Sequence, residues 1–236
     1  MSTVFISGAT GYLGSPLTKA LITTGYDVHA LTRPRSIKKL PVGCTPVPGN
    51  ALDASTFIKN VPTGSTDIHL TGVAHPSPAK AAEFRTIDQA SFEASLQSAQ
   101  AAKANHFIYV SVAQPAPIMR EYTKVRRECE MRLERSGLNV TILRPWYILG
   151  PGHRWSYLLI PLYKLAEHVP AWRDGVLRLG LVTHQQMLAA LVQATNKPSQ
   201  GVTFYDVQAI RAANFAAVSA LPSALSPTRR SSSPSA

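Results

Sequence analysis

The fold is decided by the stretch Gly8-Ala9-Thr10-Gly11-Tyr12-Leu13-Gly14. It follows a short apolar run at 4–7 and opens a segment of helical period at 12–24. In such a unit the first glycine permits a tight turn, the second lets the backbone approach a pyrophosphate, and the third lets helix and strand pack closely. The phosphates then lie at the positive end of the helix dipole. The stretch predicts a dinucleotide site, against the alternative of an ordinary turn between strand and helix.

Outward from this turn, apolar β-branched runs alternate with longer segments of helical period, which is typical of a parallel sheet covered by helices. We expect further strands at 27–32, 67–70, 107–111 and 140–143, with a weaker one at 44–47. We expect helices at 54–60, 81–104 and 120–136. The pattern predicts an α/β fold, a doubly wound parallel Rossmann sheet, over residues 1–150.

The pattern loosens after residue 150. Segments at 156–168 and 184–195 have helical period, and 201–207 reads as a short strand. We therefore expect a small C-terminal substrate-side extension over residues 151–208. Residues 209–236 are rich in Ala, Ser and Pro, and a segment of this composition buries too little apolar surface to offset its ordering entropy, so we expect a disordered tail.

Composition excludes several classes of protein. The chain has 236 residues, 45% of them hydrophobic, which excludes a wholly disordered chain, and its 14 Gly and 18 Pro follow no fibrous period. Its two cysteines, Cys44 and Cys129, have no metal-site or disulfide-framework spacing, so we expect no metal and a reducing, cytoplasmic setting. No signal peptide or bilayer-spanning run is visible, and we expect a soluble protein with no membrane partner.

The formal net charge of +11 raises the question of nucleic-acid binding. No recognition-helix motif, zinc finger or basic face with interleaved aromatics is present, and we therefore expect no nucleic-acid partner.

The glycine spacing GxxGxxG, in place of the general GxGxxG, resembles that of the short-chain dehydrogenase/reductase superfamily. The resemblance is to its extended and atypical branches, which include epimerase/dehydratase-like and NmrA-like proteins. It covers residues 1–150 well and 151–208 loosely. It implies a Rossmann fold with a nicotinamide dinucleotide held by the turn residues Gly8, Thr10, Gly11, Tyr12, Leu13 and Gly14.

The expected second strand ends without the acid that usually holds the adenosine ribose. Its end reads Leu31-Thr32-Arg33-Pro34-Arg35, followed by two lysines. A guanidinium at Arg33 would pair with a 2′-phosphate, which favours NADP(H) over NAD(H). The alternative is a solvated basic loop, because runs of charge usually face water.

The resemblance assigns three further cofactor contacts. Asn50 and Ala51 stand where relatives contact the adenine, and the segment Thr71-Gly72-Val73 matches the one that passes beneath the cofactor. Backbone beside Pro145 would meet the nicotinamide amide. An alternative for nearby Asp53 is that it only caps a helix.

Active relatives use a serine or threonine after the fifth strand and a tyrosine in a YxxxK pair. Here the pair is Tyr122 with Arg126, whose spacing of four residues places them on one helical face, so that the cation can favour the phenolate. In the family this strand ends in two serines, of which the second is normally catalytic. Ser111 matches the first of these serines and Val112 matches the second. Ser111 could still serve as the catalytic hydroxyl if a bulge shifts the strand by one residue. Alternatively Tyr122 is core, because with Val125 and Cys129 it belongs to an apolar helical stripe.

The leading hypothesis is an NADP(H)-dependent oxidoreductase for a small carbonyl or alcohol, with Tyr122 as proton donor or acceptor. A second is a non-catalytic, NmrA-like dinucleotide-binding protein, and a third is an epimerase or dehydratase that retains NAD. Trp146 and Tyr147 either line a substrate pocket or pack the C-terminal extension, and His75 and His153 have the chemistry of acid/base groups but are more often structural. The resemblance also allows a homodimer through the helices at 81–104 and 120–136.

Overall fold

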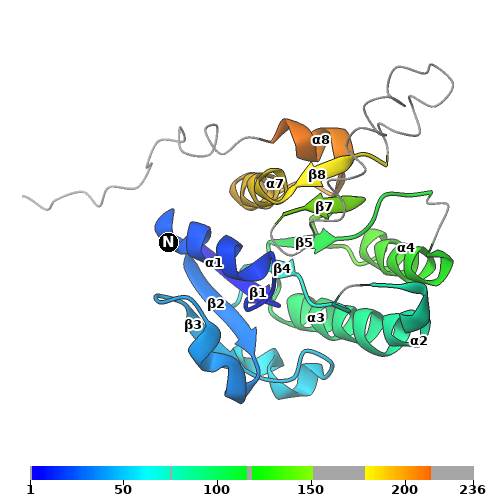
Figure 1. Cartoon of the computed structure of the whole chain (residues 1–236). Helices are drawn as coiled ribbons and strands as arrows, with labels where there is room; N and C mark the ends of the chain where they lie inside the picture. Colours follow the sequence, from blue (N-terminus) through cyan, green and yellow to red (C-terminus); the bar gives the residue numbers. More distant parts are fainter. Residues whose placement is uncertain (1, 75, 116–118, 151–178, 214–236) are drawn as a thin grey trace, which may run out of the picture.

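The computed structural model describes residues 2–74, 76–115, 119–150 and 179–213. Its centre is a seven-stranded parallel sheet with strand order β3-β2-β1-β4-β5-β6-β9 (Figure 1). The predicted doubly wound Rossmann sheet is thereby confirmed. The strands are β1 (Thr3–Ser7), β2 (Asp27–Thr32), β3 (Thr45–Pro48), β4 (Thr66–His69), β5 (His106–Val110), β6 (Val140–Leu143) and β9 (Val202–Tyr205).

Helices cover both faces of the sheet. On one face lie α1 (Gly14–Thr23), α7 (His184–Asn196) and α8 (Val207–Ala212). On the other lie α2 (Ala81–Glu83), the π-helical segment Phe84–Gln89, α3 (Ala90–Ala101) and α4 (Arg120–Glu134).

The alternation of side chains along the first strand explains why both faces are covered. Val4 and Ile6 point into the cluster formed with α1 and α7, whereas Phe5 points into the cluster on the α3 side. All three are buried, at 2% exposure or less. Because a strand buried on both faces needs apolar residues at odd and even positions, the run Val4-Phe5-Ile6 fits the centre of a parallel sheet.

The helix predicted over 81–104 is not continuous. The π-helical segment Phe84–Gln89 interrupts it between α2 and α3, and its residues Phe84 and Asp88 are buried. A π-helical turn inside a helix is uncommon and often marks a functional site. The helix predicted over 54–60 was also wrong in type, because the chain there forms two short 3₁₀ turns, Ala54–Thr56 and Ile58–Asn60.

The C-terminal part belongs to the main domain to a greater extent than predicted. Strand β9 extends the sheet beside β6, and α7 packs against α1. Strands β7 (Tyr147–Leu149) and β8 (Leu181–Thr183), which we did not predict, form a separate two-stranded parallel sheet. Helix α8 continues past the predicted boundary at 208 because its residue Ile210 is buried in the core. The helix expected at 156–168 and residues 214–236 of the expected tail lie outside the described residues.

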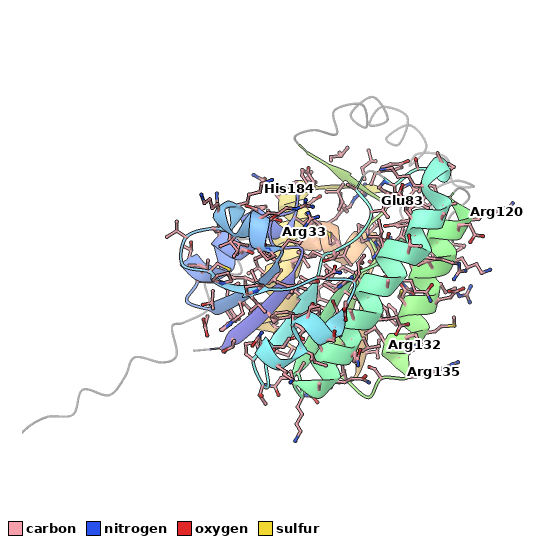
Figure 2. The ribbon with its side chains drawn as sticks, turned by 90° about the horizontal axis from the view of Figure 1, so that it is seen from below. Arg33, Glu83, Arg120, Arg132, Arg135 and His184 are labelled. Atoms are coloured by element: carbon pink, nitrogen blue, oxygen red, sulfur yellow. The ribbon has the colours of Figure 1, made fainter. Side chains whose placement is uncertain are left out.

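Most of the charged side chains of α4 face solvent. Figure 2 shows Arg120 and Arg132 of this helix, and Arg135 directly after it, pointing outward. Arg126 and Glu130 are exceptions, because they are buried at 7% and 2% exposure and each has an ion-pair partner. Within the described ranges, no helix has the length and apolar character needed to cross a membrane.

Candidate functional site

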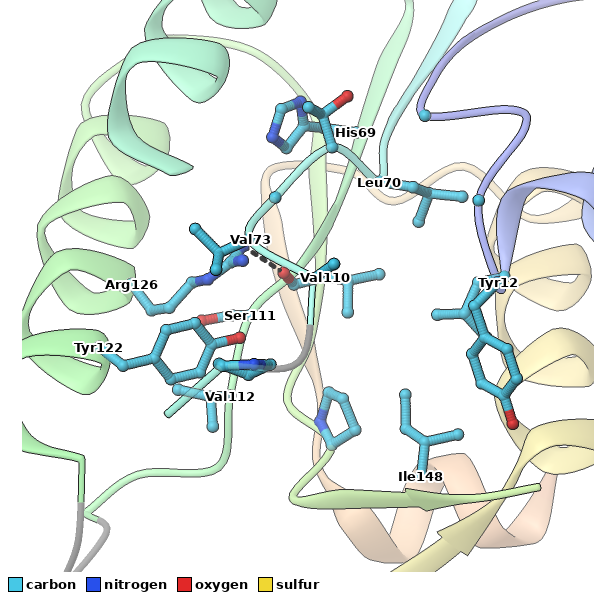
Figure 3. Close-up of a pocket in the computed structure, with 18 of the residues that line it drawn as sticks. Tyr12, His69, Leu70, Val73, Val110, Ser111, Val112, Tyr122, Arg126 and Ile148 are labelled. Atoms are coloured by element: carbon cyan, nitrogen blue, oxygen red, sulfur yellow. Dashed lines mark hydrogen bonds between the residues drawn. The ribbon is translucent and has the colours of Figure 1, made fainter. Parts of the chain in front are cut away.

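A cavity of about 510 Å³ opens at the carboxyl ends of β1, β4 and β5. The strand order reverses direction between β1 and β4, and crevices at such a switch point are where open α/β sheets bind their ligands. Figure 3 shows the cavity between Tyr12 on one side and Tyr122 with Arg126 on the other. The glycine-rich turn and the candidate catalytic residues therefore share one cavity.

The glycine-rich turn has the geometry that its sequence predicts. Gly8 has φ of +84°, and a Cβ there would come within 2.8 Å of the Leu70 backbone. A Cβ at Gly14 would press on the Gly8 carbonyl and come within 2.8 Å of the Ala9 Cα. Helix α1 starts at this point without a side-chain cap and without an acid in its first turn. Its N-terminus therefore remains suited to a phosphate.

Tyr12 in this turn is held by the C-terminal part of the chain. Its ring lies 4.5 Å from that of His184, edge to face, and the ring nitrogen Nε2 of His184 is 3.1 Å from the Tyr12 carbonyl oxygen. Helix α7 therefore supports one wall of the cavity.

The segment after β4 forms the opposite side of the switch point. Thr71, Gly72 and Val73 all line the cavity, as predicted for the stretch beneath a cofactor. The Thr71 hydroxyl is buried and has no hydrogen-bond partner among the described residues. The Val73 N–H donates to Asp88 Oδ2 at 3.1 Å, which fixes the path of this segment.

The strand end at Ser111 has no bulge. Phe107, Ser111 and Ala113 donate from their backbone N–H groups to the carbonyls of residues 139, 143 and 145, an unbroken offset of 32 residues. The bulge that could have shifted Ser111 to the second family position is therefore absent, and Val112 keeps the position that the resemblance assigns to it. Both side chains line the cavity, and the buried Ser111 hydroxyl has no partner among the described residues.

Tyr122 lies where the apolar stripe of α4 reaches the cavity. Val125 and Cys129, the next members of the stripe, are fully buried, whereas Tyr122 is partly buried and lines the cavity. Its ring packs against Phe84 at 5.0 Å, and the Arg126 guanidinium lies 5.0 Å from the ring centroid. The structure therefore brings Tyr122, Arg126 and Ser111 to one cavity.

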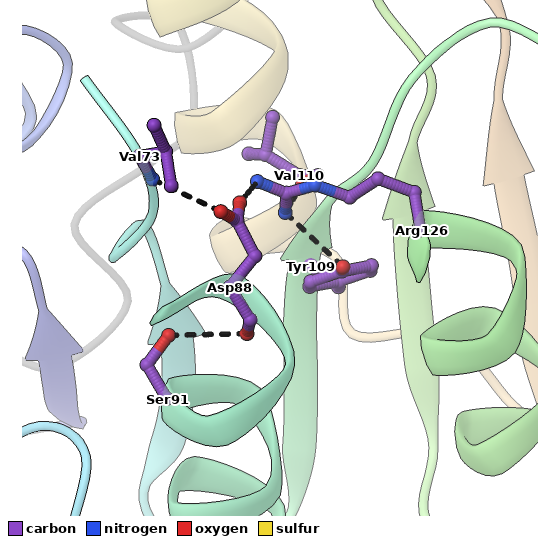
Figure 4. Close-up of polar contacts among 6 residues, drawn as sticks. All are labelled: Val73, Asp88, Ser91, Tyr109, Val110 and Arg126. Atoms are coloured by element: carbon purple, nitrogen blue, oxygen red, sulfur yellow. Dashed lines mark hydrogen bonds and ion pairs between the residues drawn. The ribbon is translucent and has the colours of Figure 1, made fainter. Parts of the chain in front are cut away.

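Arg126 has partners that the sequence did not reveal. Its Nη1 donates to the Tyr109 hydroxyl at 3.1 Å and to the Val110 carbonyl at 3.0 Å, and its Nη2 forms an ion pair with Asp88 (Figure 4). The guanidinium thus contacts the face of the Tyr122 ring while its N–H groups point elsewhere. Its charge is matched by the carboxylate of Asp88.

His69 is a further lining residue that sequence reasoning missed. Burial lowers its pKa to about 3, and its Nδ1 lies 3.0 Å from Ser7 Oγ and 2.9 Å from Ser95 Oγ. The imidazole is therefore neutral at physiological pH and does not supply a charge to the cavity.

The predicted adenosine contacts lie beyond the cavity. Arg33, Asn50 and Ala51 do not line it, and neither does Thr10 of the glycine-rich turn. The register pairs Ser7 with Leu31 and Thr32 with Pro48, so the ends of β1, β2 and β3 lie at the same edge. The exposed Arg33 is labelled in Figure 2 at the same end of the molecule as His184.

The details at this edge modify two expectations. Asn50 Oδ1 already accepts from the Leu52 N–H at 3.1 Å. Asp53 caps the 3₁₀ turn that follows it, accepting from Ser55 N at 3.0 Å, which agrees with the capping alternative.

The strand end after β6 closes the cavity. Pro145, Trp146, Tyr147 and Ile148 all line it, and the two aromatic rings meet edge to face at 5.4 Å. Trp146 also packs against the main core. Both expected roles, lining and packing, are therefore present. The candidate acid/base residues His75 and His153 lie outside the described residues.

A family model and a curated relative match most of the chain. The family model described as NAD(P)H-binding matches residues 8–155. The chain is 24% identical over 203 residues to the ceramide reductase of Caulobacter vibrioides, covering 84% of this chain. It spans 62% of the length of that relative.

Solved structures share the fold at low identity. The Bordetella bronchiseptica enzyme WbmH, in complex with NAD⁺, has a TM-score of 0.64 and 19% identity, covering 87% of this chain and 75% of that one. The UDP-N-acetylglucosamine 4-epimerase from Bacillus cereus has a TM-score of 0.63 and 15% identity, covering 87% and 79%. The oxidoreductase ylbE from Lactococcus lactis has a TM-score of 0.52 and 21% identity, covering 62% and 70%. Since the family model spans more than half of the 236 residues, the chain belongs to the NAD(P)H-binding family, and it shares the fold of WbmH and of the Bacillus cereus epimerase.

Proposed function

We propose that this protein is an NADP(H)-dependent oxidoreductase that reduces a small, largely apolar carbonyl compound or oxidises the corresponding alcohol. The observation that carries the proposal is that Tyr122 lines the same cavity as the glycine-rich turn. A phenol at this place can hand its proton to a carbonyl oxygen, while the bound dinucleotide supplies the hydride.

The described residues fit a dinucleotide. The uncapped start of α1 suits the pyrophosphate, and the buried, unpartnered hydroxyls of Thr71 and Ser111 offer hydrogen bonds deeper in the cavity. Gly8, Gly11 and Gly14 leave room for the backbone to approach the phosphates closely.

The preference for NADP(H) rests on Arg33. This exposed residue directly follows β2, at the edge where the adenosine of a dinucleotide on this turn would lie, and the chain has no acid between Asp27 and Asp53. A guanidinium favours a 2′-phosphate through charge-assisted hydrogen bonds.

Replacing Arg33 by alanine should weaken NADPH binding by about tenfold, the worth of one charge-assisted hydrogen bond to a phosphate, and leave NADH binding unchanged. Calorimetric titrations of both dinucleotides check this, with Arg35→Ala as a control in the same basic loop. Equal affinity of wild type and Arg33→Ala for NADPH would support the solvated-loop alternative and contradict the role.

The residues that line the cavity favour an uncharged substrate. Val112, Met119, Trp146 and Ile148 line it, and Arg126, whose charge is paired with Asp88, is the single charged lining residue within the described parts of the chain. Such a surface binds apolar groups and offers no free charge for an anionic substrate. The name of the Caulobacter vibrioides relative, ceramide reductase, is in keeping with this proposal.

The test is NADPH consumption, followed by nicotinamide absorbance, with a panel of apolar aldehydes and ketones of increasing chain length. We expect turnover with at least one of them, and no turnover with the keto acid of matched length, because the described lining of the cavity offers no unpaired cation to its carboxylate.

A second candidate is a dinucleotide-binding protein without catalysis. It is favoured by Val112, which by the family resemblance stands where active relatives carry a hydroxyl; the unbroken backbone register around Ser111 supports this reading. This candidate predicts tight NADPH binding with no absorbance change across the whole panel, a result that would contradict the first.

A further inference from the structure

Asp88 is a buried acid that belongs to no sequence motif. Its carboxylate is 1% exposed and lies in the π-helical segment, between the floor of the dinucleotide site and α4. One oxygen accepts from the Val73 N–H at 3.1 Å and the other forms the ion pair with Arg126 (Figure 4). Asp88 thus joins two parts of the cavity wall that are 53 residues apart in the sequence.

The surroundings are shaped to hold this pair. A Cβ at Gly72 would come within 2.8 Å of Asp88 Oδ1 and 2.9 Å of Arg126 Nη2, so the segment beneath the cofactor leaves the pair just enough room. On its far side the guanidinium is held by the Tyr109 hydroxyl and the Val110 carbonyl. The guanidinium therefore has a fixed position against the Tyr122 ring.

We propose that Asp88 is a positioning residue for Tyr122: it holds the Arg126 guanidinium against the phenol ring and cancels its charge, so that Tyr122 faces a neutral pair instead of a free cation. The inference rests on the proposed role of Tyr122 in proton transfer. It goes beyond that role, because it assigns the charge balance of the site to a residue outside the tyrosine helix.

The charge near the Tyr122 ring depends on the groups that surround it. Arg126 comes from its own helix, Asp88 from the π-helical segment and Tyr109 from β5, while the Phe84 ring that packs on Tyr122 carries no charge. Burial raises the pKa of Asp88, and the Arg126 charge and the Val73 N–H oppose that rise. Among these described groups, Arg126 and Asp88 are the ones that carry opposite charges.

The test is a phenolate titration, which needs no substrate. The ultraviolet absorbance of each variant is followed with pH, and subtracting the same variant carrying Tyr122→Phe isolates the signal of Tyr122. Asp88→Asn keeps an oxygen for the Val73 N–H but leaves the Arg126 charge unmatched. We expect the Tyr122 phenolate to appear about one to two pH units lower, because an unpaired cation about 5 Å from the ring favours the charged form.

A second substitution separates charge from simple loss of structure. Adding Arg126→Gln to Asp88→Asn removes the cation as well, and we expect the phenolate to return to within about half a pH unit of wild type. Circular dichroism over the same pH range identifies the values at which each variant is folded, and NADPH affinity is measured alongside.

The outcomes distinguish this inference from the proposed function. An unchanged phenolate titration in folded Asp88→Asn, or a shift that Arg126→Gln does not reverse, would overturn the role of Asp88 whether or not the enzyme turns over. If Asp88→Asn does not fold, Asp88→Glu gives the second comparison. This variant keeps the negative charge, so the Tyr122 phenolate should appear at the same pH as in wild type. Appearance of the phenolate at a lower pH in Asp88→Glu would count against the inference. Absence of turnover with the expected titrations would contradict only the proposed function.

Discussion

Replacing Gly14 by alanine should both destabilise the fold and abolish dinucleotide binding. The added Cβ would press on the Gly8 carbonyl and come within 2.8 Å of the Ala9 Cα, and neither backbone group can rotate away as a flexible side chain could. Helix α1 would have to move off β1, which we expect to cost about 3 kcal/mol, the upper part of the usual range for overpacking.

For a chain of this length such a loss lowers the melting temperature by roughly 6 to 12 °C. Thermal unfolding and NADPH titration measure the two effects. Lys19→Ala, at an exposed position of the same helix, is the matched control and should change neither quantity. Wild-type affinity for NADPH in Gly14→Ala would show that the turn does not hold the dinucleotide.

Replacing Tyr122 by phenylalanine should reduce kcat by about 10² to 10⁴-fold, the usual contribution of a positioned acid or base. The ring contacts with Phe84 and Arg126 need no hydroxyl, so the fold and the affinity for NADPH should be preserved. A fall in kcat with unchanged dinucleotide affinity therefore separates proton transfer from packing.

Steady-state kinetics of the two proteins with the best carbonyl from the panel measure this change. Tyr26→Phe serves as the control. It removes a phenol that donates to Asn196 Oδ1 at 2.6 Å, and neither residue lines the cavity. Its turnover should be close to that of wild type. Equal kcat in wild type and Tyr122→Phe would assign Tyr122 to the core alone.

The sequence was sufficient for most of the sheet, for a physical reason. Strands β2 and β6 have the same bounds as predicted. β6 is a continuous apolar and β-branched run, and in β2 the polar residues Asp27 and His29 alternate with Val28 and Ala30, and both patterns are typical of strands. Strands β7 and β8, with three residues each, carry too short a pattern to be recognised. The π-helical segment was missed because Phe84–Gln89 contains no glycine or proline that would mark an interruption of the helix.

The site was predictable where it depends on local chain geometry. The turn around Gly8, the segment after β4 and the face of α4 that carries Tyr122 all line one cavity, because parallel strands bring their carboxyl ends to the same edge. The Asp88 to Arg126 pair was not predictable. The two residues are 38 positions apart, and their contact depends on how the π-helical segment packs against α4.

The central claim is that a dinucleotide on the glycine-rich turn reduces a carbonyl held beside Tyr122. The most direct measurement uses NADPH deuterated at the transferable position of its nicotinamide, with the best apolar ketone from the panel, and mass spectrometry of the product. We expect wild type to give an alcohol that carries one deuterium on the former carbonyl carbon, and Tyr122→Phe to give none within the same time. Tight binding of NADPH with no deuterium in any product across the panel would contradict it.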